Sequence, residues 1–280
     1  MLGWSAMSLP YLEPPALPSV IPVHVFGVIV AIGVTIGAAV MRRYARRTGE
    51  SEIDTRVVCA WVAVTGIIGA HVLDVVFYQP GEALRHPLVL LEVWTSISSY
   101  GGFVGGALGF AFVTWRRKLR VARWADITIV GLLVAFSIGR VGCTVVHDHI
   151  GAETSSAIGF DYPREVLAAH GALPELTSHA SIIRAHNLGF EELLYLIPVN
   201  VLVLWLAFRR RLPAGALAAL TAALYAPVRF GLEHWRLASS DPPYGGLTFA
   251  QWCSVGVFVL AIVIGARIIR ASRTATRSPD

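Results

Sequence analysis

Long apolar runs alternate with short polar segments along the whole chain. Several of these runs reach the roughly 20 residues that an α-helix needs to cross a bilayer. The pattern predicts seven spans, at about residues 20–41, 57–78, 97–115, 125–146, 190–208, 214–232 and 247–269. We therefore predict an all-α polytopic membrane protein in which residues 1–280 form a single transmembrane domain.

Basic residues gather on alternate sides of the predicted spans. Of the 23 basic residues, all but six follow the first, third, fifth or seventh span. The six exceptions are Arg85, Arg140, Arg164, Arg184, Arg229 and Arg236. By the positive-inside rule, the N-terminus lies outside and the C-terminus is cytoplasmic. The long polar stretch at residues 147–189 is then a small extracytoplasmic insertion between spans four and five, and the exceptional arginines face away from the cytoplasm.

Composition agrees with a membrane location. Only 15% of the residues are charged, against about 25% in soluble domains, and the mean hydropathy is +0.62. The net charge of +5 does not indicate nucleic-acid binding, because most basic residues are placed as topology determinants. Residues 1–19 are rich in proline and lack a basic start, so we expect an irregular leader and no cleaved signal peptide. Cys59, Cys143 and Cys253 have unrelated spacings, so no disulfide framework is expected.

An arginine at the end of the fourth span is the first candidate for chemistry. A charge at membrane depth is costly, so Arg140 either extends to the interface or has a function. Gly139 and Gly142 flank it and provide no bulky side chains to cover it, which favours a function. A guanidinium offers a planar, permanently charged fork that suits a phosphate.

A second group of charges ends the sixth span. Glu233 is four residues after Arg229 and three before Arg236, so the three side chains share one helix face. They either form a structural ion pair or hold a second phosphate-binding arginine. The Tyr100-Gly101-Gly102 segment begins the third span on the same side. Its glycines can open space for a ligand head group, whereas the later glycines favour close helix packing.

The histidines allow several interpretations. His147-Asp148-His149 lacks the i, i+4 spacing of a helical zinc site, and spacing places no third ligand. Acid–base work, a metal and a solvated loop all remain open. His71 and Asp74 in the second span either pack the bundle or contact the site.

The order of these motifs resembles the prolipoprotein diacylglyceryl transferases of bacteria, over nearly all seven spans. The resemblance rests on His24-Val25-Phe26-Gly27, on the segment from Gly69 to Tyr78, on Tyr100-Gly101-Gly102, on Gly139-Arg140-Val141-Gly142, on Arg229-Phe230-x-x-Glu233-x-x-Arg236 and on Leu247-Thr248-x-x-Gln251-x-x-Ser254. Several family residues are replaced, so the chain resembles a divergent member. Phe26 replaces a tyrosine, Tyr100 a histidine and Cys143 an asparagine. Val146, His147 and Asp148 stand where the family has Asn-Gly-Glu, and His186-Asn187 stands where it has His-Pro.

The resemblance implies a reaction and a set of residues. A diacylglyceryl group would pass from phosphatidylglycerol to the lipobox cysteine of a preprolipoprotein, releasing glycerol 1-phosphate. The implied catalytic residues are Arg140, Arg229, Tyr100, His147, His149 and Glu233. The implied substrate-binding residues are Phe26, Gly101, Gly102, Gly139, Gly142, Cys143, Asp148, Gly151 and Arg236. No metal or other cofactor is required, and a monomer in the bacterial inner membrane is expected, with its site toward the extracytoplasmic side.

The residue that would act as general base is the main difference from the family pattern. A phenol titrates near 10, so Tyr100 is a poor base at neutral pH. We hypothesise that His147 or His149 replaces the lost histidine. Three alternatives remain: a paralogue that binds anionic lipid without turnover, an enzyme with another acceptor, and a transporter or metal-binding membrane protein. The absence of a visible inverted repeat disfavours a transporter.

Overall fold

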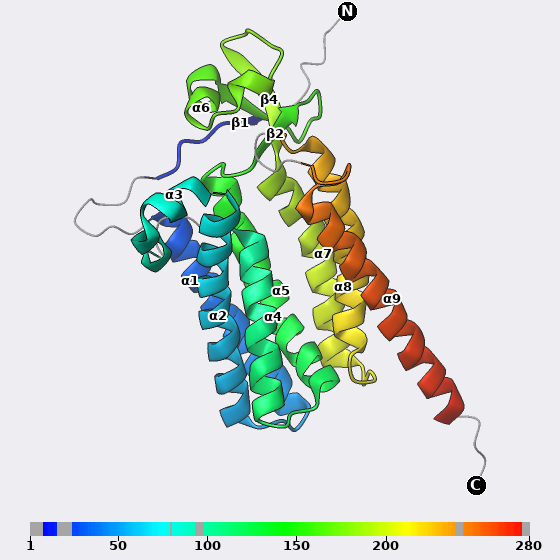
Figure 1. The fold of residues 1–280 in the computed structure, drawn as a ribbon. Helices are drawn as coiled ribbons and strands as arrows, with labels where there is room; N and C mark the ends of the chain where they lie inside the picture. The colour runs from blue at the N-terminus through cyan, green and yellow to red at the C-terminus, as the bar shows by residue number, and fades with distance from the viewer. Residues whose placement is uncertain (1–7, 16–23, 79, 93–97, 239–242, 276–280) are drawn as a thin grey trace, which may run out of the picture.

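The protein is mostly helical. The computed structural model describes residues 8–15, 24–78, 80–92, 98–238 and 243–275. Its long helices are α1 (Val25–Arg47), α2 (Glu52–Tyr78), α4 (Ser99–Arg116), α5 (Val121–Val145), α7 (Leu188–Arg209), α8 (Ala216–Leu232) and α9 (Phe249–Ala275) (Figure 1). Within the described residues, α1, α2, α5, α7 and α9 are long and apolar enough to cross a membrane. The prediction of a helical membrane protein is confirmed to that extent. Residues 20–23 of the first predicted span lie outside the described residues.

Glycines let two pairs of helices approach closely. In the pair formed by α1 and α5, a Cβ atom on Gly37 would lie 2.5 Å from the carbonyl oxygen of Gly131. In the pair formed by α2 and α4, a Cβ atom on Gly69 would lie 2.5 Å from the carbonyl oxygen of Gly101, and one on Gly105 would collide with the backbone of Thr65. Contacts this short exclude any larger residue, which is how small residues bring membrane helices together. The sequence-based prediction of close packing along the third span is confirmed.

A buried aspartate on α5 holds the start of α8. Asp126 is 1% exposed and accepts hydrogen bonds from the backbone N–H groups of Gly215, at 2.8 Å, and Ala218, at 2.9 Å. Gly215 has φ +89°, a conformation that favours glycine. The carboxylate therefore satisfies backbone donors that a helix N-terminus leaves free, and it does so from a neighbouring helix.

Asp126→Ala is expected to lower the free energy of unfolding by about 1–2 kcal/mol, the usual cost of removing a capping side chain. The matched control is Asp54→Ala, which removes a carboxylate that pairs with Arg117 on the surface; this change is expected to cost less than about 1 kcal/mol. Thermal unfolding in detergent measures both. Equal losses in the two variants would contradict the capping role of Asp126.

The polar stretch after α5 folds into a small sheet, which corrects the all-α prediction. Three strands, β2 (Ile150–Glu153), β3 (Phe160–Pro163) and β4 (Ile182–Asn187), pair antiparallel, and β1 (Leu9–Pro10) adds to the edge beside β3 in the order β1-β3-β4-β2. The short helix α6 (Arg164–Ala169) and the 3₁₀ turn η2 (Leu173–Glu175) cover it. Tyr162 and Leu167 are fully buried in its core. Part of the predicted irregular leader is thus a strand, and Pro10 is tolerated there because it is on an edge.

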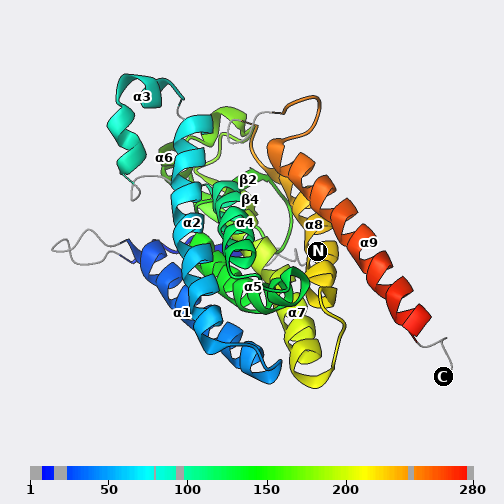
Figure 2. The same cartoon turned by 60° about the horizontal axis from the view of Figure 1, so that its bottom comes forward.

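The sheet and the interhelix turns lie at opposite ends of the bundle. Figure 1 shows the sheet and α6 at one end, and the turns that join α1 to α2, α4 to α5 and α7 to α8 at the other. Figure 2 shows α9 at the edge, beside α8. The remaining short helical segments, α3 (Pro80–Arg85), η1 (Pro87–Leu91) and η3 (Glu233–Trp235), belong to the sheet end. His71 of α2 is buried, and its Nε2 lies 2.9 Å from the carbonyl oxygen of Val89 in η1. This contact supports the interpretation that His71 packs the helix bundle.

Candidate active site

A cavity of about 810 Å³ runs between α1, α2, α4, α5 and α8. Apolar residues such as Val34, Met41, Phe110 and Ile129 line the half that is farther from the sheet. Charged and polar residues line the half near the sheet, namely Asp74, Tyr100, Arg140, Cys143, Asp148, His149, Arg229 and Arg236. The cavity is therefore amphipathic along its length, with its cationic end beside the sheet.

Arg140 lies at the cationic end, 3% exposed. Its Nε is 2.9 Å from Oε2 of Glu192 on α7, and its guanidinium lies 4.7 Å from the centre of the Phe136 ring. Its Nη1 donates to Sγ of Cys143 at 3.6 Å. Glu192 is itself buried and accepts a hydrogen bond from the Tyr225 hydroxyl. The arginine is thus held by a carboxylate, a ring and a sulfur, with its orientation fixed before any ligand binds.

Arg229 is the second buried cation. Its Nη1 is 2.5 Å from Oε2 of Glu233, and its guanidinium lies 5.4 Å from the centre of the Tyr100 ring. The Nε of Arg236 lies 3.9 Å from the other carboxylate oxygen of Glu233. Glu233 has no exposed side-chain surface, so it positions both arginines without lining the cavity itself. The predicted stripe of three charges is confirmed as a contact network. The Tyr100 ring faces Arg229, and its buried hydroxyl makes no hydrogen bond to any described residue.

The five glycines predicted to bind substrate divide into two groups. A Cβ atom on Gly139 would meet nothing within 4 Å, and one on Gly102 would meet only ordinary contacts, the nearest at 3.7 Å, so these two leave space in the cavity. Gly101 instead touches the backbone of α2. A Cβ atom on Gly142 would lie 3.0 Å from the Phe26 ring, and one on Gly151 would lie 2.5 Å from the carbonyl oxygen of Trp235.

Phe26 and Gly151 therefore shape the site rather than present polar groups to it. Phe26 lines the cavity and packs against Gly142. Gly151 pairs with Arg236 in an isolated antiparallel bridge. This bridge ties strand β2 to the segment that carries the third arginine, so the sheet helps to place that arginine.

His147 does not reach the cavity. It is 2% exposed, with Nδ1 3.1 Å from the Tyr162 hydroxyl and Nε2 3.1 Å from the carbonyl oxygen of Leu12. The Asn187 amide also lies 3.1 Å from Nδ1, and burial lowers the pKa of His147. With φ +52° its backbone is in the left-handed region, which turns the chain from α5 into the sheet. His147 joins the leader, the sheet and the start of α7.

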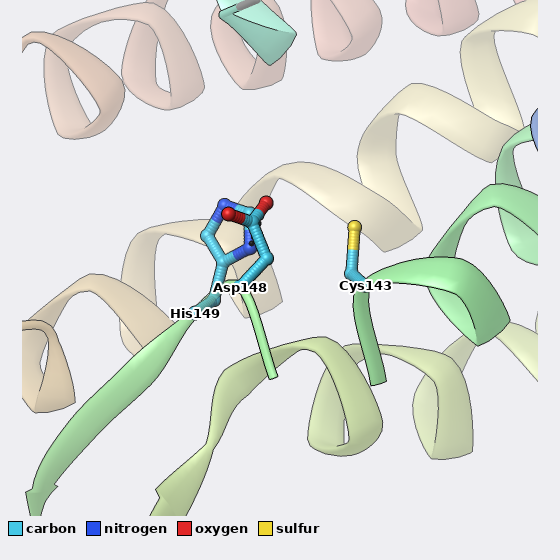
Figure 3. Close-up of side chains that lie close together, drawn as sticks. All are labelled: Cys143, Asp148 and His149. Atoms are coloured by element: carbon cyan, nitrogen blue, oxygen red, sulfur yellow. Dashed lines mark ion pairs between the residues drawn. The ribbon is translucent and has the colours of Figure 1, made fainter. Parts of the chain in front are cut away.

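Asp148 and His149 do reach the cavity, together with Cys143. Figure 3 shows the three side chains projecting to the same side, Cys143 from the end of α5 and the other two from the loop that follows. Oδ2 of Asp148 lies 3.1 Å from Nδ1 of His149. Burial lowers the pKa of His149 more than the neighbouring carboxylate raises it. Burial raises the pKa of Asp148, but His149, Arg140 and Arg236 together lower it below its ordinary value. Asp148 is therefore a carboxylate at neutral pH. Its side chain is 55% exposed, toward the cavity.

Comparison with known proteins assigns the family. The family model described as prolipoprotein diacylglyceryl transferase matches residues 15–267, which is most of the chain. The chain belongs to the prolipoprotein diacylglyceryl transferase family.

Three similar proteins illustrate the divergence within that family. The phosphatidylglycerol–prolipoprotein diacylglyceryl transferase 2 of Streptomyces coelicolor is 30% identical over 270 residues, covering 91% of this chain and 80% of that protein. The phosphatidylglycerol–prolipoprotein diacylglyceryl transferase of Leifsonia xyli is 28% identical over 277 residues, covering 95% and 78%. The transferase 2 of Clostridium perfringens is 24% identical over 244 residues, covering 86% and 90%. The resemblance inferred from the motifs is confirmed over nearly the full length.

Sequence reasoning missed one residue of the site. Glu192 is the carboxylate that pairs with Arg140, yet it was not among the predicted residues. Its signal in the sequence was an acidic residue inside the fifth apolar run, where a charge is costly without a partner. The partner is on another helix, so no spacing along the chain could identify it.

Proposed function

We propose that the protein transfers the diacylglyceryl group of phosphatidylglycerol to a lipobox cysteine thiol of a preprolipoprotein and releases glycerol 1-phosphate. The observation that carries this proposal is the amphipathic cavity with Arg140 and Arg229 buried at one end. A phospholipid has the same two-part character, an anionic phosphate and apolar acyl chains. The names of the related proteins and the chain's place in this family support the same reaction.

The arginines stabilise the phosphate that leaves. Arg140, Arg229 and Arg236 contribute three positive charges, and Glu192 and Glu233 contribute two negative charges. The ion-paired set therefore has one excess positive charge, which the Asp148 carboxylate at the same end of the cavity offsets, so the phosphate is held by positioned donors rather than by a net charge. Preorganised cations in a water-poor site favour the transition state, because negative charge grows on the phosphate as the C–O bond breaks.

The thiol of the acceptor attacks the glyceryl carbon that carries the phosphate. An S–C bond forms, the C–O bond breaks, and the electron pair leaves with the phosphate oxygen. The thiolate is the nucleophile, so the thiol must lose its proton. Of the two histidines proposed as base, we assign this role to His149, because it lines the cavity and His147 is enclosed in the sheet.

The two histidines give opposite expected results. His147→Ala is expected to lower the free energy of unfolding by about 1–3 kcal/mol, since it leaves buried polar partners unsatisfied, and to leave the turnover of the folded fraction unchanged. His149→Ala is expected to lower turnover by about 10²-fold or more, the usual contribution of a positioned base, with little change in thermal unfolding. Tyr100→Phe serves as the third comparison. Loss of turnover in Tyr100→Phe alone would overturn the assignment of His149.

We place the site on the extracytoplasmic side of a seven-span protein. At about 1.5 Å per residue, α4 with 18 residues and α8 with 17 are about 25–27 Å long, close to the roughly 30 Å hydrocarbon core. The basic turns lie at the end opposite the sheet, which makes that end cytoplasmic by the positive-inside rule. The N-terminus is then outside and the sheet is the extracytoplasmic insertion. We further propose that the protein acts as a monomer, since one chain encloses the cavity.

The test is transfer from labelled phosphatidylglycerol to a lipobox peptide by the purified protein in lipid nanodiscs. The expected product is a thioether-linked diacylglyceryl peptide, with glycerol 1-phosphate as the second product. A protein that binds anionic lipid without turnover would retain the label and yield neither product. Transfer to another thiol but not to the peptide would indicate a different acceptor.

A further inference from the structure

Three potential metal ligands meet at the cationic end of the cavity. Sγ of Cys143, a carboxylate oxygen of Asp148 and a ring nitrogen of His149 all lie within 4.8 Å of one another. The sequence alone offered His147, Asp148 and His149, whereas the turn after α5 brings Cys143 to Asp148 and His149 and places His147 elsewhere. Together they are a thiol, a carboxylate and an imidazole, the three side-chain types that zinc prefers.

The geometry is close to that of a zinc site. Zn–S distances near 2.3 Å and Zn–N and Zn–O distances near 2.0–2.2 Å put the ligand atoms of a tetrahedral site about 3.3–3.7 Å apart. Oδ2 of Asp148 and Nδ1 of His149 are already 3.1 Å apart. A shift of the Asp148 and His149 side chains by roughly 1 Å, which a side-chain rotation can supply, would bring their ligand atoms to this spacing from Sγ of Cys143. Asp148 has the freedom for it, since its side chain is 55% exposed toward the cavity.

The only polar group that Nδ1 of His149 faces in the described residues is another member of the cluster, the Asp148 carboxylate at 3.1 Å. Nδ1 of His149 is buried and makes no hydrogen bond of good geometry to any described residue, although the Asp148 carboxylate is near. A buried ring nitrogen without a hydrogen bond is costly, which a bound cation would offset.

The charges around the cluster also fit a divalent cation. Zn²⁺ with the thiolate of Cys143 and the carboxylate of Asp148 is a neutral group, so it replaces the single negative charge of Asp148 beside Arg140 and Arg236. The contact from Nη1 of Arg140 to Sγ, at 3.6 Å, remains favourable because a zinc-bound thiolate still accepts hydrogen bonds. The metal would also neutralise Asp148, which otherwise opposes the binding of an anionic lipid at this end.

We propose that Cys143, Asp148 and His149 bind one Zn²⁺ ion, whose fourth position faces the cavity and takes the thiol of the acceptor. Three protein ligands with an open position are typical of catalytic rather than structural zinc. A coordinating thiol is deprotonated outright, so its proton passes to water and the zinc-bound sulfur attacks the glyceryl carbon as the C–O bond to phosphate breaks. This inference rests on the proposed function and replaces one part of it: the metal, and not His149 as a base, activates the thiol, and His149 is a ligand of that metal.

Metal binding tests the site without reference to activity. Full-length protein in detergent is stripped with a chelator, incubated with Zn²⁺ or Co²⁺, desalted and analysed for metal per chain. We expect one ion per chain, and for Co²⁺ the near-ultraviolet absorption of a metal–thiolate bond and the visible bands of tetrahedral coordination. Cys143→Ser should abolish the thiolate absorption, and Asp148→Asn and His149→Gln should weaken Zn²⁺ binding by more than the roughly 10–100-fold cost of losing an outer-shell partner.

Two variants outside the cavity serve as matched controls. Cys253→Ser removes a thiol from α9 and His179→Gln removes an exposed imidazole beside the sheet, and both should keep the ion and its spectrum. Thermal unfolding of each variant shows that the fold is retained. Absence of bound metal in the wild type, or a cobalt–thiolate spectrum that persists in Cys143→Ser, would overturn the zinc site.

Transfer measured in parallel separates this inference from the proposed function. Full transfer by protein that holds no metal would overturn the zinc site and leave the transferase and the base role of His149 in place. Stoichiometric zinc bound by the three residues, with no transfer to the peptide, would establish the site and overturn the function.

Discussion

Arg140→Ala is expected to lower kcat/KM for diacylglyceryl transfer by at least about 10²–10³-fold, the cost of removing one preorganised donor to a developing oxyanion. Arg140 contributes a full charge as well as donors, and its 3% exposure means that few water molecules screen that charge. Arg140→Lys is expected to restore little, because an ammonium cannot reproduce the planar fork. The measurement is the initial rate of transfer from labelled phosphatidylglycerol in nanodiscs.

Stability must be measured in the same variant. Removing Arg140 leaves Glu192 buried beside the Tyr225 hydroxyl alone, and breaking a buried pair costs about 3–5 kcal/mol. The double variant Arg140→Gln with Glu192→Gln removes both charges and should recover most of that loss while transfer stays absent. Arg184→Ala is the matched control, since Arg184 also pairs with a carboxylate, Asp161, but lies on the sheet outside the cavity. Normal transfer in folded Arg140→Ala would refute the role of this arginine.

Arg229→Ala is expected to lower kcat/KM by about 10²-fold or more for the same electrostatic reason. Its effect on stability should be smaller than that of Arg140→Ala. The difference arises because Glu233 keeps a second cation, Arg236, at 3.9 Å, whereas no second arginine or lysine is paired with Glu192 in the described residues. Transfer rates and thermal unfolding, measured on both arginine variants, test the two statements separately.

The control for Arg229 is Arg164→Ala. Arg164 donates to the carbonyl oxygen of Ser178 beside the sheet and does not line the cavity. Arg164→Ala should therefore leave the rate of transfer unchanged. If Arg229→Ala lost as much stability as Arg140→Ala, Arg236 would not be acting as the second partner of Glu233. If it retained full transfer, the phosphate would have to be held by Arg140 and Arg236 alone.

Some features of the fold followed directly from local pattern. Apolar runs of helical length located the long helices, because a chain in lipid must satisfy its backbone hydrogen bonds within each segment. Repeated small residues located the contact between α2 and α4. The stripe of Arg229, Glu233 and Arg236 was visible because its members are three and four residues apart on one face.

The sheet could not be read in the same way. Its strands are only two to six residues long, and β1 comes from the leader, far along the chain from its neighbour β3. Strand pairing between distant segments leaves no periodic signal in one sequence. The position of His147 could not be read from the sequence for a related reason. Its backbone, with φ +52°, turns the side chain into the sheet, while Asp148 and His149 face the cavity.

The class of the protein, the helical segments, the order of the family motifs and the choice of the buried arginines could all be inferred from the amino-acid sequence. These depend on composition, period and spacing, which are local properties. Which side chains meet could be seen only in the folded protein: Glu192 with Arg140 across two helices, Arg229 with Tyr100, and Cys143 with Asp148 and His149 around one point in the cavity. Such contacts arise from helix packing and from the turn that ends α5. Packing joins residues according to distance in space, and a single sequence records only distance along the chain.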